Sequence, residues 1–330
     1  MSLRSGAAGL RLRPERVLTD RRMFLIAVTL VTAVVMSFLS PFFLSFDNIL
    51  SITKFGVVVG LLALGQTLVI LGGGGGIDLS VGSLLGLAGI CMGLLVDTGV
   101  NVWIAAAITL VIGSLLGAIN GALVTVIGIP PLIATLGTLY AYESAAFVAA
   151  KGVTITGFAQ AGYPFVGQGR ILGIPAQVVL TLVPAYALAG LMMARHRFGR
   201  RIYEVGNNER AASLVGTSPN QVRFALYCIS GLLAGLGAVV TNSWLLAARP
   251  GAGSNLVLQT ITIAVLGGTY IFGGSGTVSG TLLAVVFIVI LSSGLQLAGV
   301  DQVWQLGALG FLLVLTVMVN NLLTARSGGR

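Results

Sequence analysis

Side chains that could carry out chemistry are scarce in this sequence and lie far apart. The 330 residues include one histidine, His196, and two cysteines, Cys91 and Cys228. A zinc site takes three or four His, Cys or carboxylate ligands at close spacing, and the sequence has no such cluster. A Ser-His-Asp set would have to be built around His196, which lies in a basic stretch. The sequence therefore predicts a chain with no catalytic residue, no metal ligand and no cofactor-binding residue of its own.

The sequence also lacks the loop with which many proteins hold ATP. That phosphate-binding loop has the pattern GxxxxGK[ST], and neither of the two lysines, Lys54 and Lys151, ends such a loop. If the protein works with ATP and magnesium, we expect them on a separate subunit.

Two acidic residues, Asp78 and Glu143, fall within apolar stretches. A charge at the centre of a bilayer costs about 2.5–3.5 kcal/mol, so such residues usually face a cavity or a partner. A proton- or sodium-coupled carrier usually needs more ionisable groups than these two. An ion-coupled secondary transporter of a small polar solute therefore remains an alternative, and a weaker one.

The composition is that of a membrane protein. Hydrophobic residues make up 56% of the chain and charged residues only 8%, against about 25% charged in soluble domains. Mean hydropathy is +1.02. The 47 glycines suit apolar helices that pack closely in lipid. The sequence predicts an all-α polytopic fold of about ten transmembrane helices, each near the roughly 20 residues that a span needs. The expected spans are 23–44, 55–71, 77–96, 102–127, 131–150, 174–194, 224–246, 257–272, 278–298 and 303–323.

The basic residues orient these spans. Fourteen of the 18 Lys and Arg residues precede the first span, follow the last one, or lie in the 195–223 loop. Cytoplasmic loops collect Lys and Arg, so both termini and the 195–223 loop are expected in the cytoplasm. This distribution accounts for the net charge of +9 without nucleic-acid binding, which needs a basic face with base-reading side chains.

Five consecutive glycines, Gly72 to Gly76, precede Ile-Asp-Leu-Ser-Val-Gly-Ser at 77–83. Such a run favours a broken or tightly turned backbone that lines protein or water. Asp78 and Ser80 are candidates to cap the first N–H groups of the next span. These residues suit a translocation pathway, and they equally suit a simple cytoplasmic turn followed by a helix cap.

The 195–223 loop contains the signals of a short helix. Asn207 or Asn208 can act as N-cap, and Glu209 sits favourably in the first turn. Ala211, Ala212 and Leu214 follow, and Gly216 suits the position just after the helix. A surface helix between two spans can transmit force from a cytoplasmic partner; the alternative is a structured loop without a partner.

Together with Leu266-Gly-Gly-Thr and Gly-Gly-Ser-Gly-Thr-Val-Ser-Gly-Thr-Leu-Leu at 273–283, with Asn120-Gly121 and with Ile-Pro-Pro-Leu-Ile-Ala-Thr-Leu-Gly at 129–137, these stretches carry a resemblance. The chain resembles the permease family of ribose-, xylose- and arabinose-type ABC importers over roughly residues 45–323. It departs where family members commonly carry a Glu-x-Asp pair, because those places hold Val257 and Gln259.

The resemblance implies a permease in the bacterial inner membrane that takes up a sugar or sugar-like solute. It implies three kinds of partner: a cytoplasmic ABC ATPase that holds ATP and magnesium, a periplasmic solute-binding protein, and a second permease subunit. It also implies that the 206–216 segment is the coupling helix that docks on the ATPase, with candidate residues Gly206, Asn208, Glu209, Ala211, Leu214 and Gly216. The expected organisation is a basic N-terminal segment at 1–22, a transmembrane permease domain at 23–323 and a cytoplasmic tail at 324–330.

Polar and aromatic residues inside the expected spans are candidates for contact with the solute. With Asp78 and Ser80, they are Gln66, Asn120, Asn242, Trp244 and Gln259. For each of the in-span residues, interhelical hydrogen bonding or anchoring at the membrane interface is the alternative role. Besides an importer permease and an ion-coupled carrier, a membrane scaffold that transports nothing remains open.

Overall fold

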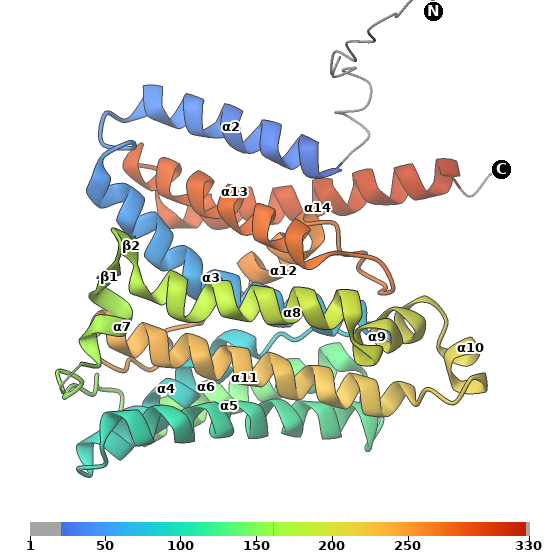
Figure 1. Cartoon of the computed structure of the whole chain (residues 1–330), viewed down its shortest axis with the longest axis horizontal. Helices are drawn as coiled ribbons and strands as arrows, with labels where there is room; N and C mark the ends of the chain where they lie inside the picture. Colours follow the sequence, from blue (N-terminus) through green and yellow to red (C-terminus); the bar gives the residue numbers. More distant parts are fainter. Residues whose placement is uncertain (1–20, 161, 328–330) are drawn as a thin grey trace, which may run out of the picture.

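The computed structural model describes residues 21–160 and 162–327, which are mostly helical. Figure 1 shows the long helices lying roughly side by side, with α9 and α10 at one end of the bundle and a small β-hairpin at the other. The long apolar helices are α2 (Arg21–Leu39), α3 (Phe46–Leu71), α4 (Val81–Asp97), α5 (Val102–Thr125), α6 (Pro131–Ala149), α8 (Val183–Arg195), α11 (Pro219–Leu245), α12 (Leu256–Leu266), α13 (Val278–Leu297) and α14 (Gln302–Ser327).

The remaining elements are short connections. The α6–α8 connection holds α7 (Pro164–Gln168), strands β1 (Arg170–Ile171) and β2 (Ile174–Pro175), and a π-helical turn, η1 (Val178–Leu182). The α8–α11 connection holds α9 (Arg197–Asn207) and α10 (Glu209–Leu214). The two strands pair in antiparallel register, Arg170 with Pro175.

Within the described residues, seven helices are long and apolar enough to cross a membrane, while α4, α12 and the Gln302–Met318 part of α14 are shorter apolar helices. The all-α polytopic prediction is therefore confirmed, and the count of ten spans stays a prediction. Residues 328–330 of the expected cytoplasmic tail at 324–330, and residues 1–20 of the expected basic segment at 1–22, lie outside the described residues.

Several helix ends differ from the expected spans for local reasons. Helix α2 ends at Leu39, before Pro41, because proline disfavours helix in the residue ahead of it. Helix α12 ends at Leu266 instead of residue 272, since Gly268 adopts φ +101° and ends the regular backbone. Helix α4 begins at Val81 instead of Ile77, because the chain before it is extended and turned.

Helix α3 forms the centre of the bundle. Its most apolar window is 89% buried, whereas the corresponding window of α2 is 11% buried. A helix that is apolar all round is typical of a bundle interior, and one with large exposed apolar faces suits contact with lipid.

Helices α5 and α11 approach each other closely through glycine. A Cβ atom built on Gly231 would lie 2.2 Å from the Gly113 carbonyl oxygen, and one on Gly117 would lie 2.2 Å from the Tyr227 carbonyl oxygen. Only glycine allows backbones to meet at this distance, which agrees with the close packing expected from the composition.

Candidate functional site

The glycine run after α3 turns the chain back alongside that helix. Gly73, Gly74 and Gly75 have φ values of +69°, +65° and +71°, in the left-handed region that favours glycine. The Gly76 N–H then donates to the Gly73 carbonyl oxygen at 3.1 Å. The predicted tight turn is confirmed, and it returns the chain into the bundle before α4 begins.

Asp78 is fully buried at the end of this returning segment. Its Oδ1 accepts hydrogen bonds from the Ser80 backbone N–H at 2.9 Å and from the Ser80 hydroxyl at 2.7 Å. Ser230 Oγ on α11 donates to Asp78 Oδ2 at 3.4 Å. The carboxyl group thus ties the entry of α4 to α11.

The side-chain amide of Gln66, on α3, pairs with both backbone polar groups of Asp78. With its amide oriented to satisfy both groups, its nitrogen donates to the Asp78 carbonyl oxygen at 3.0 Å and its oxygen accepts from the Asp78 N–H at 3.2 Å. Asn120 of α5 donates from Nδ2 to Ser80 Oγ at 2.7 Å. Since buried backbone groups need partners, these amides make the extended segment tolerable inside the bundle.

We call Gln66, Asp78, Ser80, Asn120 and Ser230 the Asp78 cluster; all five are buried. Four of them are sequence candidates that the structure brings together. The prediction that Ser80 caps α4 is wrong, because its side chain makes no cap hydrogen bond and turns to Asp78 and Asn120 instead. The cluster members pack on one another, so their visible role in this conformation is to hold the broken segment.

The other candidates lie elsewhere. Asn242 donates from Nδ2 to the Gly89 carbonyl oxygen at 3.0 Å, which is the interhelical hydrogen bond that the sequence left open as its alternative role. Trp244 lines a cavity of about 370 Å³ with Thr241 and Arg249, near the α7 end of the bundle, where Gln168 donates to the Trp244 carbonyl oxygen.

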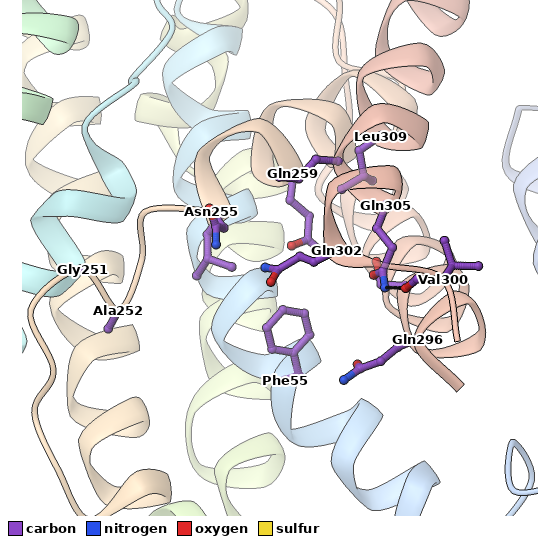
Figure 2. Close-up of a pocket in the computed structure, with 13 residues that line it drawn as sticks. Phe55, Gly251, Ala252, Asn255, Gln259, Gln296, Val300, Gln302, Gln305 and Leu309 are labelled. Carbon is purple, nitrogen blue, oxygen red and sulfur yellow. Dashed lines mark hydrogen bonds between the residues drawn. The ribbon is translucent and has the colours of Figure 1, made fainter. Parts of the chain in front are cut away.

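Gln259 lines a second cavity, of about 480 Å³, which shares Phe55, Gly251, Ala252 and Leu256 with the first. Figure 2 shows that its walls carry several amide side chains. With Gln259 these are Asn255, Gln296, Gln302 and Gln305, and we call this cavity the amide pocket. Its lining residues include no ionisable side chain.

Helix α10 has the features predicted for the short helix of the 195–223 loop. Asn208 Oδ1 accepts from the Ala211 N–H at 3.0 Å, and Gly216 has φ +82° just beyond the helix. Leu214 is 89% exposed and Ala211 is exposed. Ala212, by contrast, is buried and is not available to a partner. The separate helix α9 that precedes α10 was not expected, although Phe198, Ile202 and Val205 recur at helical spacing.

An ion pair joins α10 to the glycine run. Arg223 Nη2 lies 2.8 Å from Glu209 Oε2, and Arg223 Nε donates to the Gly72 carbonyl oxygen at 3.2 Å. The predicted position of Glu209, in the first turn of the helix, is confirmed. Its ion pair with Arg223 was not predicted from the sequence.

Three glycine-containing segments meet at the end of α9, and we call this contact the glycine junction. A Cβ atom on Gly206 would lie 2.1 Å from the Leu71 carbonyl oxygen and 2.4 Å from the Gly274 nitrogen. The Gly274 N–H donates to the Leu71 carbonyl oxygen at 3.1 Å. The end of α9 therefore touches the α3–α4 and α12–α13 connections at once.

Comparison with known proteins assigns the chain to a family. Residues 48–317 match a family model described as the permease component of a branched-chain amino acid transport system. The chain belongs to this permease family. No solved structure matches it.

The permease has relatives of almost equal length. It is 36% identical over 291 residues to the ribose import permease protein of Bacillus subtilis (strain 168), covering 88% of this chain and 89% of that protein. It is 36% identical over 300 residues to the ribose import permease protein of Escherichia coli (strain K12), covering 90% and 92%. It is 36% identical over 289 residues to the autoinducer 2 import system permease protein of Enterobacter sp. (strain 638), covering 86% and 88%.

Several residues of this permease were not found from the sequence. Ser230 belongs to the Asp78 cluster, and Gln296, Gln302 and Gln305 belong to the amide pocket. Glutamines inside or beside an apolar helix were a usable signal, since polar side chains in spans usually face protein. Their convergence depends on the arrangement of α12, α13 and α14, which a single sequence does not reveal.

Proposed function

We propose that this chain is the transmembrane permease subunit of an ABC importer that moves a sugar or sugar-like solute into the cytoplasm. A separate ATPase subunit would bind ATP and magnesium and drive alternating access. A periplasmic solute-binding protein would deliver the solute, and a second permease, identical or different, would complete the pathway. The observation that carries the proposal is α10, a capped helix with Leu214 exposed, joined through α9 and the glycine junction to two loops of the bundle.

The relatives support the import of such a solute. Two are named ribose import permeases and one an autoinducer 2 import permease, and each aligns over most of the chain. The description of the family model names branched-chain amino acids instead. The uncharged lining of the amide pocket favours the former kind of solute over a zwitterion.

We further propose ten spans with both termini in the cytoplasm. Figure 1 shows α9, α10 and the start of α2 towards the end of the bundle at which α14 finishes, with β1 and β2 at the other end. The basic residues of the 195–223 stretch lie around α9 and α10, as expected of a cytoplasmic face.

Cysteine labelling tests this orientation. In a background with Cys91 and Cys228 replaced by Ala, single cysteines at Asn208 and Ser327 are expected to be shielded from an impermeant thiol reagent in intact cells. The same is expected of Ser5, which lies outside the described residues. A cysteine at Gln168, exposed at the end of α7, should react. Reaction of the Asn208 cysteine from outside would contradict the ten-span orientation.

Docking on α10 is tested by Ala211→Trp. Ala211 is exposed on α10, so the indole would block a partner's approach without entering the bundle. We expect the variant to insert into the membrane and to elute from a size-exclusion column as the wild type does. It should lose co-purification of the ATPase and solute-stimulated ATP hydrolysis. Ala187→Trp is the matched control, because Ala187 is exposed on α8, away from α10.

Retention of both properties by Ala211→Trp would show that α10 is not the docking element.

The purified chain alone in liposomes should show no ATP hydrolysis and no uptake driven by a proton or sodium gradient. Gradient-driven uptake by the chain alone would instead support the ion-coupled carrier.

A further inference from the structure

The amide pocket is built where α3, α12, α13 and α14 come together. Phe55 comes from α3, Gln259 from α12, Gln296 from the end of α13 and Gln302 from the start of α14. Figure 2 shows the Gln302 side chain between Gln259 and the Phe55 ring. Its volume of about 480 Å³ falls within the roughly 300–1,000 Å³ of small-molecule sites.

The amide groups in this pocket are largely unpaired. In the part of the chain that the structure describes, the side chains of Asn255, Gln259, Gln296 and Gln302 make no hydrogen bond. Gln259 is 95% buried, whereas the other three are exposed. Gln305 alone is held, through Nε2 to the Val300 carbonyl oxygen at 2.9 Å. Because Gln259 is buried and its amide has no partner in the described residues, an occupant that supplies hydrogen bonds to it is favoured, whereas the exposed amides can bond to water.

The chemistry of the lining indicates what kind of occupant fits. Each amide offers two N–H donors and an acceptor oxygen, which matches a hydroxyl group that both donates and accepts. The Phe55 ring and Leu256 add an apolar wall for C–H groups. Since the lining has no ionisable side chain, a charged or zwitterionic molecule would find no counter-charge within the pocket; Arg249 lines the adjoining cavity.

We propose that the amide pocket is a binding site for an uncharged polyhydroxylated solute, held mainly by Gln259 and Gln302 beside the Phe55 ring. That this solute is the one transported rests on the proposed function; the binding itself does not. The site is separate from the Asp78 cluster, whose side chains bond to one another.

Direct binding to the purified chain in lipid nanodiscs tests the proposal, with radiolabelled D-ribose as the probe and L-leucine as the zwitterionic comparison. We expect D-ribose to bind and L-leucine not to bind. Gln259→Leu and Gln302→Leu each remove an amide and should weaken D-ribose binding about tenfold or more. Gln221→Leu makes the same change at an exposed position on α11 and should bind as the wild type does.

A second measurement does not depend on removing an amide. Ser292→Cys, in a chain without Cys91 and Cys228, places a thiol in the pocket wall with little change in size. D-Ribose should slow its reaction with a small neutral maleimide, and L-leucine should not.

The proposal is overturned if the wild-type chain binds no D-ribose at tens of millimolar, or if both pocket variants bind it unchanged. Protection of the Ser292 cysteine by L-leucine alone would overturn the solute class. ATPase co-purification, measured on the same preparations, is expected to be unaffected in the pocket variants. Its absence from the wild type would count against the proposed function and not against the pocket.

Discussion

Gly231→Val should be among the most damaging single substitutions in the transmembrane bundle. The new Cβ atom would lie 2.2 Å from the Gly113 carbonyl oxygen and 2.9 Å from the Gly117 Cα atom. These are backbone atoms, so no rotamer change relieves the clash and α5 must move away from α11. Overpacking of this kind costs about 3 kcal/mol or more, and we expect the apparent Tm in detergent to fall by roughly 5–10 °C.

Gly137→Val is the matched control for this prediction. Gly137 lies in the interior of α6, and a Cβ atom built there meets no atom within 4 Å. The same substitution should therefore leave the Tm and the size-exclusion profile close to those of the wild type. Equal losses in the two variants would mean that valine disturbs these helices generally and that the α5–α11 contact is not special.

Asp78→Leu should destabilise the protein by a similar amount for a different reason. It preserves the branching of the side chain but removes the acceptor of the Ser80 N–H, the Ser80 hydroxyl and the Ser230 hydroxyl. Each buried donor left without an acceptor costs about 1–3 kcal/mol, so the loss should be about 3 kcal/mol or more. Thermal unfolding in detergent and the yield of monodisperse protein measure it.

Asp78→Asn separates the hydrogen bonds from the charge. The asparagine Oδ1 can keep both hydrogen bonds from Ser80, and its amide nitrogen, Nδ2, can donate to the Ser230 hydroxyl. We expect a Tm near that of the wild type and solute uptake within about twofold, as for a group whose role is to hold the α3–α4 segment. A stable Asn variant that no longer transports would show that the carboxylate acts in gating or along the pathway.

The fold was predictable where one residue type dominates a long stretch. Apolar runs bounded by Gly and Pro predicted helices close to α5, α6 and α13, because length and apolarity suffice to define a membrane-crossing helix. The start of α3 was wrong, since the helix begins at Phe46 and not at residue 55. The end of α12 was mistaken by six residues, since Thr269 to Phe272 are as compatible with a helix as with the turn that Gly268 initiates. Helix α9 was missed because its many arginines resemble a solvated loop.

The sites were predictable only in part. Asp78, Ser80, Gln66 and Asn120 were selected one by one as polar residues in apolar surroundings, and their mutual hydrogen bonds depend on the glycine turn bringing three helices together. Gln259 was selected in the same way, but the other amides of its pocket were not. They come from the start of α12, the end of α13 and the start of α14, where polar residues are ordinary at a membrane surface.

The glycine junction offers a route for linkage between the proposed docking helix and the amide pocket. Helix α12 carries Gln259 and leads into the connection that holds Gly274, which meets Gly206 and the Leu71 carbonyl oxygen at the end of α9. If occupation of α10 by an ATPase changes the solute affinity of the amide pocket tenfold, solute must change ATPase affinity tenfold, a linkage of about 1.4 kcal/mol. At the junction that energy would pass between main-chain atoms, because neither Gly206 nor Gly274 has a side chain. Side chains contribute as well, since Asn207 Nδ2 donates to the Gly274 carbonyl oxygen and the Tyr203 hydroxyl to that of Gly276. The two ends of the bundle would thus be linked by displacement of α9 together with this connection.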